Sequence, residues 1–285
     1  MINIRGGRGR GYIRNVRGAS PAVSAVILTA AIVVLVLVAV NFATTFLEAR
    51  ISESEFASVK QFMQTAAVQV DDIAWIPWRT QTFRHSCKYG SMNFISDALN
   101  YTIYYKNASG EYHISELSGI LTFKMPISKY NMYDGYFDLV YPASDSLVNS
   151  LVFRGATAPV ARVFAVEKLS TGNYVRLILN PCVRVVEANV SGEKQYKVYL
   201  PILYKAEPKG NNPTVTFTST QLSSLVIPNV TEIRIVVTSL IYDADFFVKS
   251  PASVDKITDE VIDVDDGSTL ILYISEVRVS IGVHP

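Results

Sequence analysis

Residues 19–47 read ASPAVSAVILTAAIVVLVLVAVNFATTFL, and this stretch decides how the chain is organised. It contains no charged residue and no histidine, and residues 30–40 are apolar without interruption. A helix needs about 20 apolar residues to cross a bilayer core about 30 Å thick, and this run exceeds that length. Ser20 is a favourable N-cap, and Pro21 falls where a helix tolerates a missing backbone donor. The sequence therefore predicts a membrane-spanning helix.

Residues 1–18, directly before this helix, are strongly basic. They hold no acidic residue, and their arginines are Arg5, Arg8, Arg10, Arg14 and Arg17. Positive charge next to a hydrophobic helix keeps that side of the helix in the cytoplasm. We therefore expect a cytoplasmic N-terminus and an external location for the residues that follow the helix.

Three interpretations of the apolar helix compete. A cleaved secretory signal has an apolar core of about 7–15 residues, and the run here is about twice as long. A plain signal-anchor helix would stay uncut in the membrane. The third interpretation depends on the junction Arg17-Gly18-Ala19-Ser20-Pro21, where a basic residue and a glycine stand directly before the uncharged helix.

This junction resembles the class III signal peptide of archaeal type IV pilins and related surface-filament subunits. The resemblance extends over roughly residues 1–75. It implies that a prepilin peptidase cuts after Gly18, removes the basic leader 1–18 and leaves Ala19 as the new N-terminus. Many pilins carry a Glu five residues into the mature chain, where this sequence has Val23; archaeal members often lack that Glu. The resemblance implies that the apolar helices of many copies form a filament core.

The helix is expected to continue over residues 48–74 with an amphipathic pattern. Apolar residues return there about every 3.5 positions, at Ile51, Phe56, Val59, Phe62, Met63, Ala66, Val70 and Ile73. No Gly or Pro interrupts residues 22–74, so one helix of about 50 residues would be about 75–80 Å long. The alternative is two helices with a bend near residues 41–45, where polar side chains loosen the backbone ladder. The first half suits lipid or like helices, and the second suits the underside of a domain.

The sequence Trp75-Ile76-Pro77-Trp78 is expected to end the helix. Proline disfavours a helical conformation at the residue before it, and the two indole rings are expected to pack where the helix meets the following domain.

From Thr80 onward, short segments rich in Val, Ile, Tyr, Phe and Thr alternate with turn residues, which predicts strands. The expected strands are 80–87, 92–95, 101–105, 111–116, 119–124, 136–141, 150–154, 160–167, 173–179, 182–187, 195–204, 214–218, 231–240 and 270–283. We therefore expect an α+β fold: one long N-terminal helix followed by a mainly antiparallel β-sandwich of immunoglobulin-like kind over residues 75–285. We also expect a short helix within 251–265, begun by Ser253. The β domain is either divided in two, with the loop 205–213 as the best place for the division, or a single large sandwich.

The composition limits the classes of function. The chain has 285 residues, of which 49% are hydrophobic and 18% charged, and its formal net charge is +1. The leader holds five of the 26 basic residues, so residues 19–285 have 21 basic against 25 acidic residues, a net charge of −4. A nucleic-acid-binding domain would need clustered basic residues, so we expect no nucleic-acid partner. The 29 Tyr and Phe residues favour strands and contact surfaces.

The predicted topology places both cysteines, Cys87 and Cys182, outside the cell. Such a pair either forms one disulfide that closes a long loop or remains as two separate buried thiols. With two cysteines and only three histidines (His85, His113 and His284), we expect no metal site of the usual N/S type and no cofactor.

Four Asn-X-Ser/Thr sequons lie in the predicted β domain, at Asn100, Asn107, Asn189 and Asn229. Given an exported topology, we expect N-glycosylation. Asn107 and Asn229 fall in predicted turns and are better acceptors than Asn100, which adjoins a predicted strand.

The sequence lacks the Gly-x-Ser-x-Gly, phosphate-loop and His-Glu-x-x-His motifs of catalysis. Two Ser-x-x-Lys matches, Ser191 with Lys194 and Ser253 with Lys256, lack the companion motifs of a serine acyltransferase. The acidic residues before Gly267, which are Asp263, Asp265 and Asp266, resemble part of a calcium loop. Their spacing, and Ile274 where a Glu is expected, favour an Asp-Gly hairpin turn. We therefore expect no enzymatic activity.

Two classes of function follow. The first is a pilin-like structural subunit whose partners are other copies of itself, prepilin peptidase and the membrane, with the β domain displayed at the cell surface for adhesion or surface contact. The second is a monomeric, membrane-anchored surface protein whose β domain binds a ligand. A minor pilin, or an accessory of the pilus or archaellum machinery, is a third and related interpretation.

Overall fold

A computed structural model describes residues 21–282 except 86, 134–135, 137, 143–149, 169–172, 209–213 and 241–255, with only the backbone described for 164–168 and 256. The expected leader, with Arg17, Gly18 and Ala19, lies outside the described residues. The chain divides into two compact units, residues 1–48 and residues 49–285. We describe each unit by itself.

Helix α1 (Pro21–Ala74) is a single helix of 54 residues, without the alternative break at residues 41–45. Its end lies where Pro77 predicts it, and the backbone N–H of Ile76 still reaches the carbonyl of Ile73 at 3.2 Å. Two residues further on, Trp78 adopts a positive φ of 69°, which turns the chain away from the helix direction.

The second unit is rich in strands, and several are longer than the sequence indicates. The strands are β1 (Thr80–Arg84), β2 (Ser91–Asn107), β3 (Gly110–Pro126), β4 (Leu139–Tyr141), β5 (Val152–Arg154), β6 (Ala161–Lys168), β7 (Tyr174–Pro181), β8 (Val183–Val190), β9 (Glu193–Ala206), β10 (Thr214–Ser239) and β11 (Lys256–Ile281). The expected pairs of short strands within 91–107 and 110–126 are each one long strand, because register shifts let a strand bend without ending.

All the described strands belong to one sheet, with the order β4-β6-β7-β3-β2-β10-β11-β9-β8-β5 and with β1 added beside β10. Most neighbours are antiparallel, but β11 with β9 and β5 with β8 are parallel. The structure is therefore α+β with a large, mixed, mostly antiparallel open sheet. One connected sheet takes the place of the two separate sheets that an immunoglobulin-like sandwich has.

Two predictions near the C-terminus are wrong. Residues 256–265 are not helical but form the start of β11, because residues 256–263 pair with residues 232–238 of β10; Ser253 lies outside the described residues. Asp266-Gly267 is not a hairpin turn. Residues 264–267 are a bulge within β11, opposite Thr231, and Gly267 supplies the positive φ of 85° that the bulge requires.

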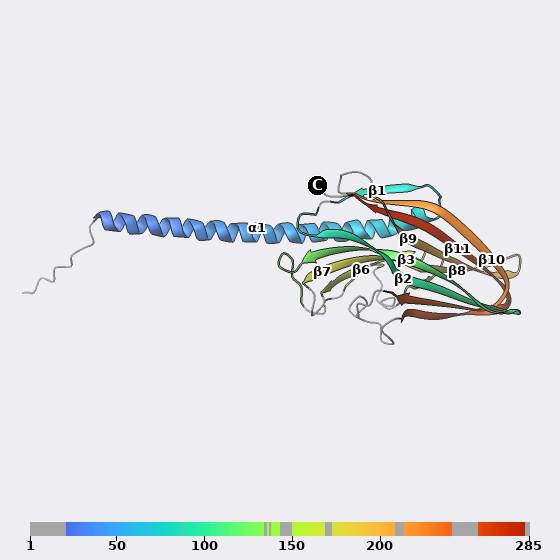
Figure 1. The fold of residues 1–285 in the computed structure, drawn as a ribbon. Helices are drawn as coiled ribbons and strands as arrows, with labels where there is room; N and C mark the ends of the chain where they lie inside the picture. Colours follow the sequence, from blue (N-terminus) through green and yellow to red (C-terminus); the bar gives the residue numbers. More distant parts are fainter. Residues whose placement is uncertain are drawn as a thin grey trace, which may run out of the picture. The chain divides into compact units, whose positions relative to one another are not determined.

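This bulge makes the sheet fold back over itself. β10 carries its own irregularity at the same place, where Asn229 has a φ of 59°. Figure 1 shows β10 and β11 bending together at the end of the β domain. Each strand therefore contributes its two halves to different layers.

The bent sheet encloses one core and covers another. The core between the layers, which we call the sheet core, includes Leu99, Tyr101, Ile103, Ile178, Val198, Leu200, Ile233, Ile235 and Leu272. The helix core lies between α1 and the opposite face of the sheet and includes Phe56, Val59, Met63, Val70, Leu121, Phe123, Leu177, Phe217 and Val279. Neighbouring residues such as Ile178 and Leu179 belong to different cores, because successive side chains of a strand point to opposite faces.

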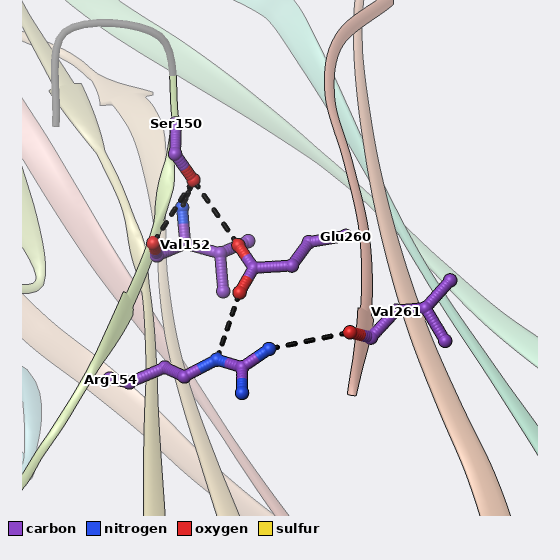
Figure 2. Close-up of polar contacts among 5 residues, drawn as sticks. All are labelled: Ser150, Val152, Arg154, Glu260 and Val261. Carbon is purple, nitrogen blue, oxygen red and sulfur yellow. Dashed lines mark hydrogen bonds and ion pairs between the residues drawn. The ribbon is translucent and has the colours of Figure 1, made fainter. Parts of the chain in front are cut away.

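Side chains join β5, the last strand in the sheet order, to the first half of β11 (Figure 2). Arg154 donates from Nε to Glu260 Oε1 at 2.9 Å and from Nη2 to the carbonyl of Val261 at 3.3 Å. Ser150 donates to the other oxygen of Glu260 at 3.3 Å. A buried contact supports this seam, since the Leu151 N–H donates to Thr258 Oγ1 at 2.9 Å. Among the described strands, β5 pairs in the backbone ladder with β8, and these side chains add its connection to β11.

Candidate functional site

The part of α1 in the first unit is an exposed apolar surface, which we call the apolar segment (residues 21–48). Every residue in it is exposed, and its large apolar side chains from Val23 to Leu47 are 50–73% exposed. By length and composition this is the one described helix that could cross a membrane. Soluble monomers rarely expose contiguous apolar patches of more than a few hundred Å². Such a segment is a feature of membrane-associated or secreted proteins.

The three threonine hydroxyls of this segment bond to the helix itself. Thr29 donates to the carbonyl of Ala25 at 2.9 Å, and Thr44 and Thr45 both donate to the carbonyl of Asn41 at 2.9 Å. Hydroxyls satisfied in this way need no water, which is the condition that lipid or a packed helix bundle imposes. These three hydroxyls are therefore compatible with a dry environment.

The remainder of α1, which we call the seated segment (residues 49–74), is packed within the second unit. Its buried positions recur at helical spacing: Ser52, Glu55, Phe56, Val59, Met63, Ala66, Ala67, Val70, Ile73 and Ala74. Ser52 donates to the carbonyl of Lys129 at 2.7 Å, and Lys60 forms a half-exposed ion pair of 2.7 Å with Asp138. The seated segment is thus fixed by polar contacts as well as by the helix core.

A buried carboxylate provides the most specific of these contacts. Glu55 is 8% exposed, and its two oxygens accept the successive backbone N–H groups of Lys88, Tyr89 and Gly90 at 2.9–3.2 Å. Consecutive N–H groups that converge on an anion form a nest, and the charge strengthens each hydrogen bond. Gly90 is required here, since a Cβ would lie 2.1 Å from the ring of Phe123. The loop before β2 is therefore locked to the helix.

A second polar contact holds the end of the seated segment. Asp71 accepts hydrogen bonds from Arg184 Nη1 at 2.9 Å and from Trp75 Nε1 at 2.7 Å. The Arg184 guanidinium also lies over the rings of Tyr199, 4.9 Å from its centroid, and Trp75, at 5.8 Å. Tyr199 stacks in turn on Tyr273. This arrangement links α1 to β8, β9 and β11.

The last carbonyl of α1 is satisfied by the sheet. Ser219 donates to the carbonyl of Ala74 at 3.3 Å, and Ser275 donates to the same oxygen. The Trp78 N–H then donates to the carbonyl of Ser219 at 2.8 Å. The last carbonyl groups of a helix have no intrahelical donor, so when they are buried they need a hydrogen-bond donor from elsewhere in the protein. The expected packing of Trp75 at this junction is found, whereas Trp78 is 76% exposed.

Cys87 and Cys182 are two separate thiols in the structure. Of the two alternatives that the sequence allowed, a disulfide or two free thiols, the structure has the second. Cys182 is buried in the sheet core, and Cys87 is half-buried against the helix core, on the other face of the sheet. Burial raises the pKa of both thiols; the pKa of Cys87 reaches about 12 because its burial is reinforced by the negative charge of Glu55. Both thiols are therefore poor nucleophiles.

The four sequons fall in two kinds of place. Asn107, Asn189 and Asn229 lie at strand ends or at a bulge, and the last two are exposed. Asn100 lies within β2, between Leu117 of β3 and Thr238 of β10, and its Oδ1 is buried. Asn189 and Asn229 thus differ from Asn100 in their access to solvent, whereas Asn107 is half-buried like Asn100 but lies at a strand end.

The residues that the sequence singled out for chemistry have structural contacts. Lys194 forms ion pairs with Glu187, at 3.4 Å, and with Asp265, and the backbone carbonyl of Asp263 accepts from Tyr196. His113 packs on the ring of Tyr104. His284 and Ser253 lie outside the described residues. Within the described part of the chain, no three His, Cys, Asp or Glu side chains are grouped to hold a metal ion.

Glu55 and Arg184 are anchoring residues that the sequence pattern did not identify. For Glu55 a signal was present: it stands four residues before Val59 and next to Phe56, on the stripe that is buried. For Arg184 there was none, because its partner Asp71 is 113 residues away in the sequence.

Comparison of the chain with protein-family models, with curated proteins and with solved structures found no match. The class of protein is therefore defined by its architecture. One long apolar N-terminal helix followed by a large β-sheet domain is a pilin-like architecture.

Proposed function

We propose that this chain is a pilin-like structural subunit of an archaeal type IV-like surface filament. The observation that supports it most strongly is the apolar segment, whose side chains are exposed along its whole length within a helix that ends in the seated segment. In this proposal the apolar segments of many copies form the filament core, and the β domains are displayed outside for adhesion or surface contact.

Apolar burial supplies the driving force for assembly. The segment exposes 15 large apolar side chains from Val23 to Leu47. Full burial of one such side chain contributes about 1.5–3 kcal/mol, so the segment as a whole is stabilised by tens of kcal/mol in lipid or among other helices. A chain that leaves the membrane keeps this stabilisation only by packing against like helices.

The seated segment supports a load-transmitting role for the helix. Glu55, Asp71 and the Ala74 carbonyl fix it to the loop before β2, to β8 and to β10, respectively. A subunit held in a fibre by its helix needs such a connection, because a force on the β domain would otherwise separate the seated segment from the sheet. The proposal assigns the chain no enzymatic activity and no cofactor.

The proposal includes processing and export. Prepilin peptidase would cut between Gly18 and Ala19, and the precursor would lie in the membrane with a cytoplasmic N-terminus before the mature protein reaches the cell surface.

A second candidate is a monomeric surface binding protein that keeps its leader and stays anchored. The apolar segment is long enough to span a bilayer, and this length supports the anchored monomer as well as it supports the filament subunit.

The N-terminal residue of the protein isolated from cells separates the two functions. We expect a chain that begins at Ala19 and filaments on the cell surface, with Gly18→Val abolishing both. Gly11→Val, within the same leader, is the matched control and should leave both unchanged. A chain that retains the leader, and whose surface display is insensitive to Gly18→Val, would identify the anchored monomer.

A further inference from the structure

Three of the four sequons form a row at one end of the β domain. Asn107 of β2 is paired with Val230, the residue after Asn229, and Val230 is paired with Ser268 of β11. The next residue of β11, Thr269, is paired with Gln195 of β9, and Asn189 of β8 is paired with Lys194. The row therefore crosses five neighbouring strands, which places its ends about 19 Å apart at about 4.8 Å per strand.

The local backbone presents these asparagines at turns or bends. Figure 1 shows the β2–β3 turn, the β8–β9 turn and the bend of β10 at the same end of the domain. Asn229 is exposed, with a φ of 59° at the bend, and Asn189 is exposed just before the turn at residues 191–192. Asn107 opens the turn to Gly110. Asn189 and Asn229 are exposed, and Asn107, although half-buried, lies at the end of its strand.

Hydrogen bonds orient two of the three side chains. Asn107 Oδ1 accepts the Ser109 N–H at 2.9 Å, and Asn189 Oδ1 accepts the Gly192 N–H at 3.1 Å. Because the amide oxygen is held by the turn, the amide nitrogen lies on the other side of the planar group. That nitrogen is the atom to which an N-linked sugar is attached.

Asn100 is a natural contrast within the same chain. It lies in the middle of β2 with a strand on each side, and its Oδ1 is buried. A sugar there would have to leave from within the sheet rather than from its end.

We propose that Asn107, Asn189 and Asn229 form one N-glycan attachment surface that covers this end of the β domain, and that Asn100 is not modified. The inference rests on the proposed export of the β domain. In each transfer, a bond forms between Asn Nδ2 and C1 of a sugar carried by a lipid-linked phosphate donor. The C1–O bond to the phosphate breaks, the lipid phosphate leaves with the bonding electrons, and Nδ2 loses one proton.

The test uses the full chain isolated from the surface of its native cells, with intact mass and glycopeptide mass spectrometry. We expect sugar on at least two of the three asparagines and none on Asn100. Asn107→Gln, Asn189→Gln and Asn229→Gln should each remove at most one glycan mass, whereas Asn100→Gln should remove none. Ser109→Ala, Ser191→Ala and Thr231→Ala remove the same sequons but keep the asparagine side chains, so a loss of glycan is separable from a disturbed turn.

Sugar on fewer than two of the three asparagines, or on Asn100, would overturn the inference. The N-terminal residue and surface location are measured on the same sample. A surface chain that begins at Ala19 but carries no sugar contradicts the glycan surface and leaves the proposed function standing. A chain found in the cytosol contradicts both.

Discussion

The Glu55 carboxylate on α1 accepts a 2.9 Å hydrogen bond from the backbone N–H of Gly90, the residue directly before β2. The same carboxylate accepts the N–H groups of Lys88 and Tyr89, so one helical side chain orders a whole loop of the sheet. Hydrogen bonds to a buried charged group are among the strongest polar contributions to stability.

We therefore predict that Glu55→Ala lowers the free energy of unfolding by about 2–3 kcal/mol, because it leaves backbone donors without an acceptor. Urea unfolding of the full chain in detergent micelles, followed by tryptophan fluorescence, measures this change. Glu53→Ala is the matched control, since Glu53 is exposed and forms an ion pair with Arg50 on the helix surface, and it should change stability by less than about 0.5 kcal/mol. Equal effects of the two variants would show that the loop is not held by Glu55.

The seam between β5 and β11 yields a second prediction. The buried Leu151 N–H donates to Thr258 Oγ1, and Thr258→Val keeps the side-chain volume but removes the acceptor. We expect a loss of about 1–3 kcal/mol, the usual effect of a buried donor left unsatisfied. Thr258→Ser retains the hydroxyl and should lose less than Thr258→Val. The same unfolding experiment checks both variants, and a serine variant less stable than the valine variant would contradict the seam.

A pair of carboxylates on the sheet predicts a dependence of stability on pH. Burial, and then the charge of Glu276, raise the pKa of Glu116 above its ordinary value of 4.5. The folded state therefore binds a proton more readily than the unfolded state, and stability falls as the pH rises from 4.5 through the folded pKa. Below pH 4.5 the group is protonated in both states and this loss is absent.

Glu116→Gln should therefore raise Tm at pH 7 and flatten the decline of Tm with pH above 4.5. Thermal unfolding from pH 4 to pH 8 is the measurement. Glu193→Gln, at an exposed turn, controls for the loss of one negative charge. An unchanged pH profile in Glu116→Gln would mean that this carboxyl does not titrate differently on folding.

The buried thiols predict a low chemical reactivity. With a pKa of about 12, Cys87 has far less thiolate at pH 8 than an ordinary cysteine, and Cys182 is buried. We expect alkylation of the native protein by iodoacetamide to be at least about 100-fold slower than that of free cysteine. In urea both thiols should be alkylated without a reductant, as intact mass would show. A requirement for reductant would instead reveal a Cys87–Cys182 disulfide.

The apolar segment predicts the effect of one charge on membrane association. Leu35 is 69% exposed near the middle of the segment, and an arginine there costs about 3 kcal/mol in a membrane-spanning helix. We expect Leu35→Arg to reduce the membrane-bound precursor and the yield of surface filaments, whereas Leu35→Ile should preserve both. Membrane fractionation and electron microscopy of cells provide the readouts. Wild-type levels in Leu35→Arg would contradict a role for this segment in lipid or in a filament core.

The sequence predicted the elements better than their arrangement. It predicted the long helix, its end before Pro77 and most strand positions, because helical and strand periodicities are local properties. It predicted a short helix within 251–265, although residues 256–265 belong to β11, because strand pairing with β10 is not visible locally. It also predicted Ile51 on the buried stripe, but Ile51 is 43% exposed, whereas Glu55 is buried.

By itself, the sequence determined that this chain has an uncharged apolar run near its N-terminus and a strand-rich remainder, since both follow from the order of residues within short windows. Only the tertiary structure decided that the strands form one bent sheet, that Glu55 meets a nest of backbone N–H groups, and that three asparagines share one end of the domain. These relationships join residues tens of positions apart, and their partners are selected by hydrogen bonding and burial across the whole fold rather than by neighbours in the chain.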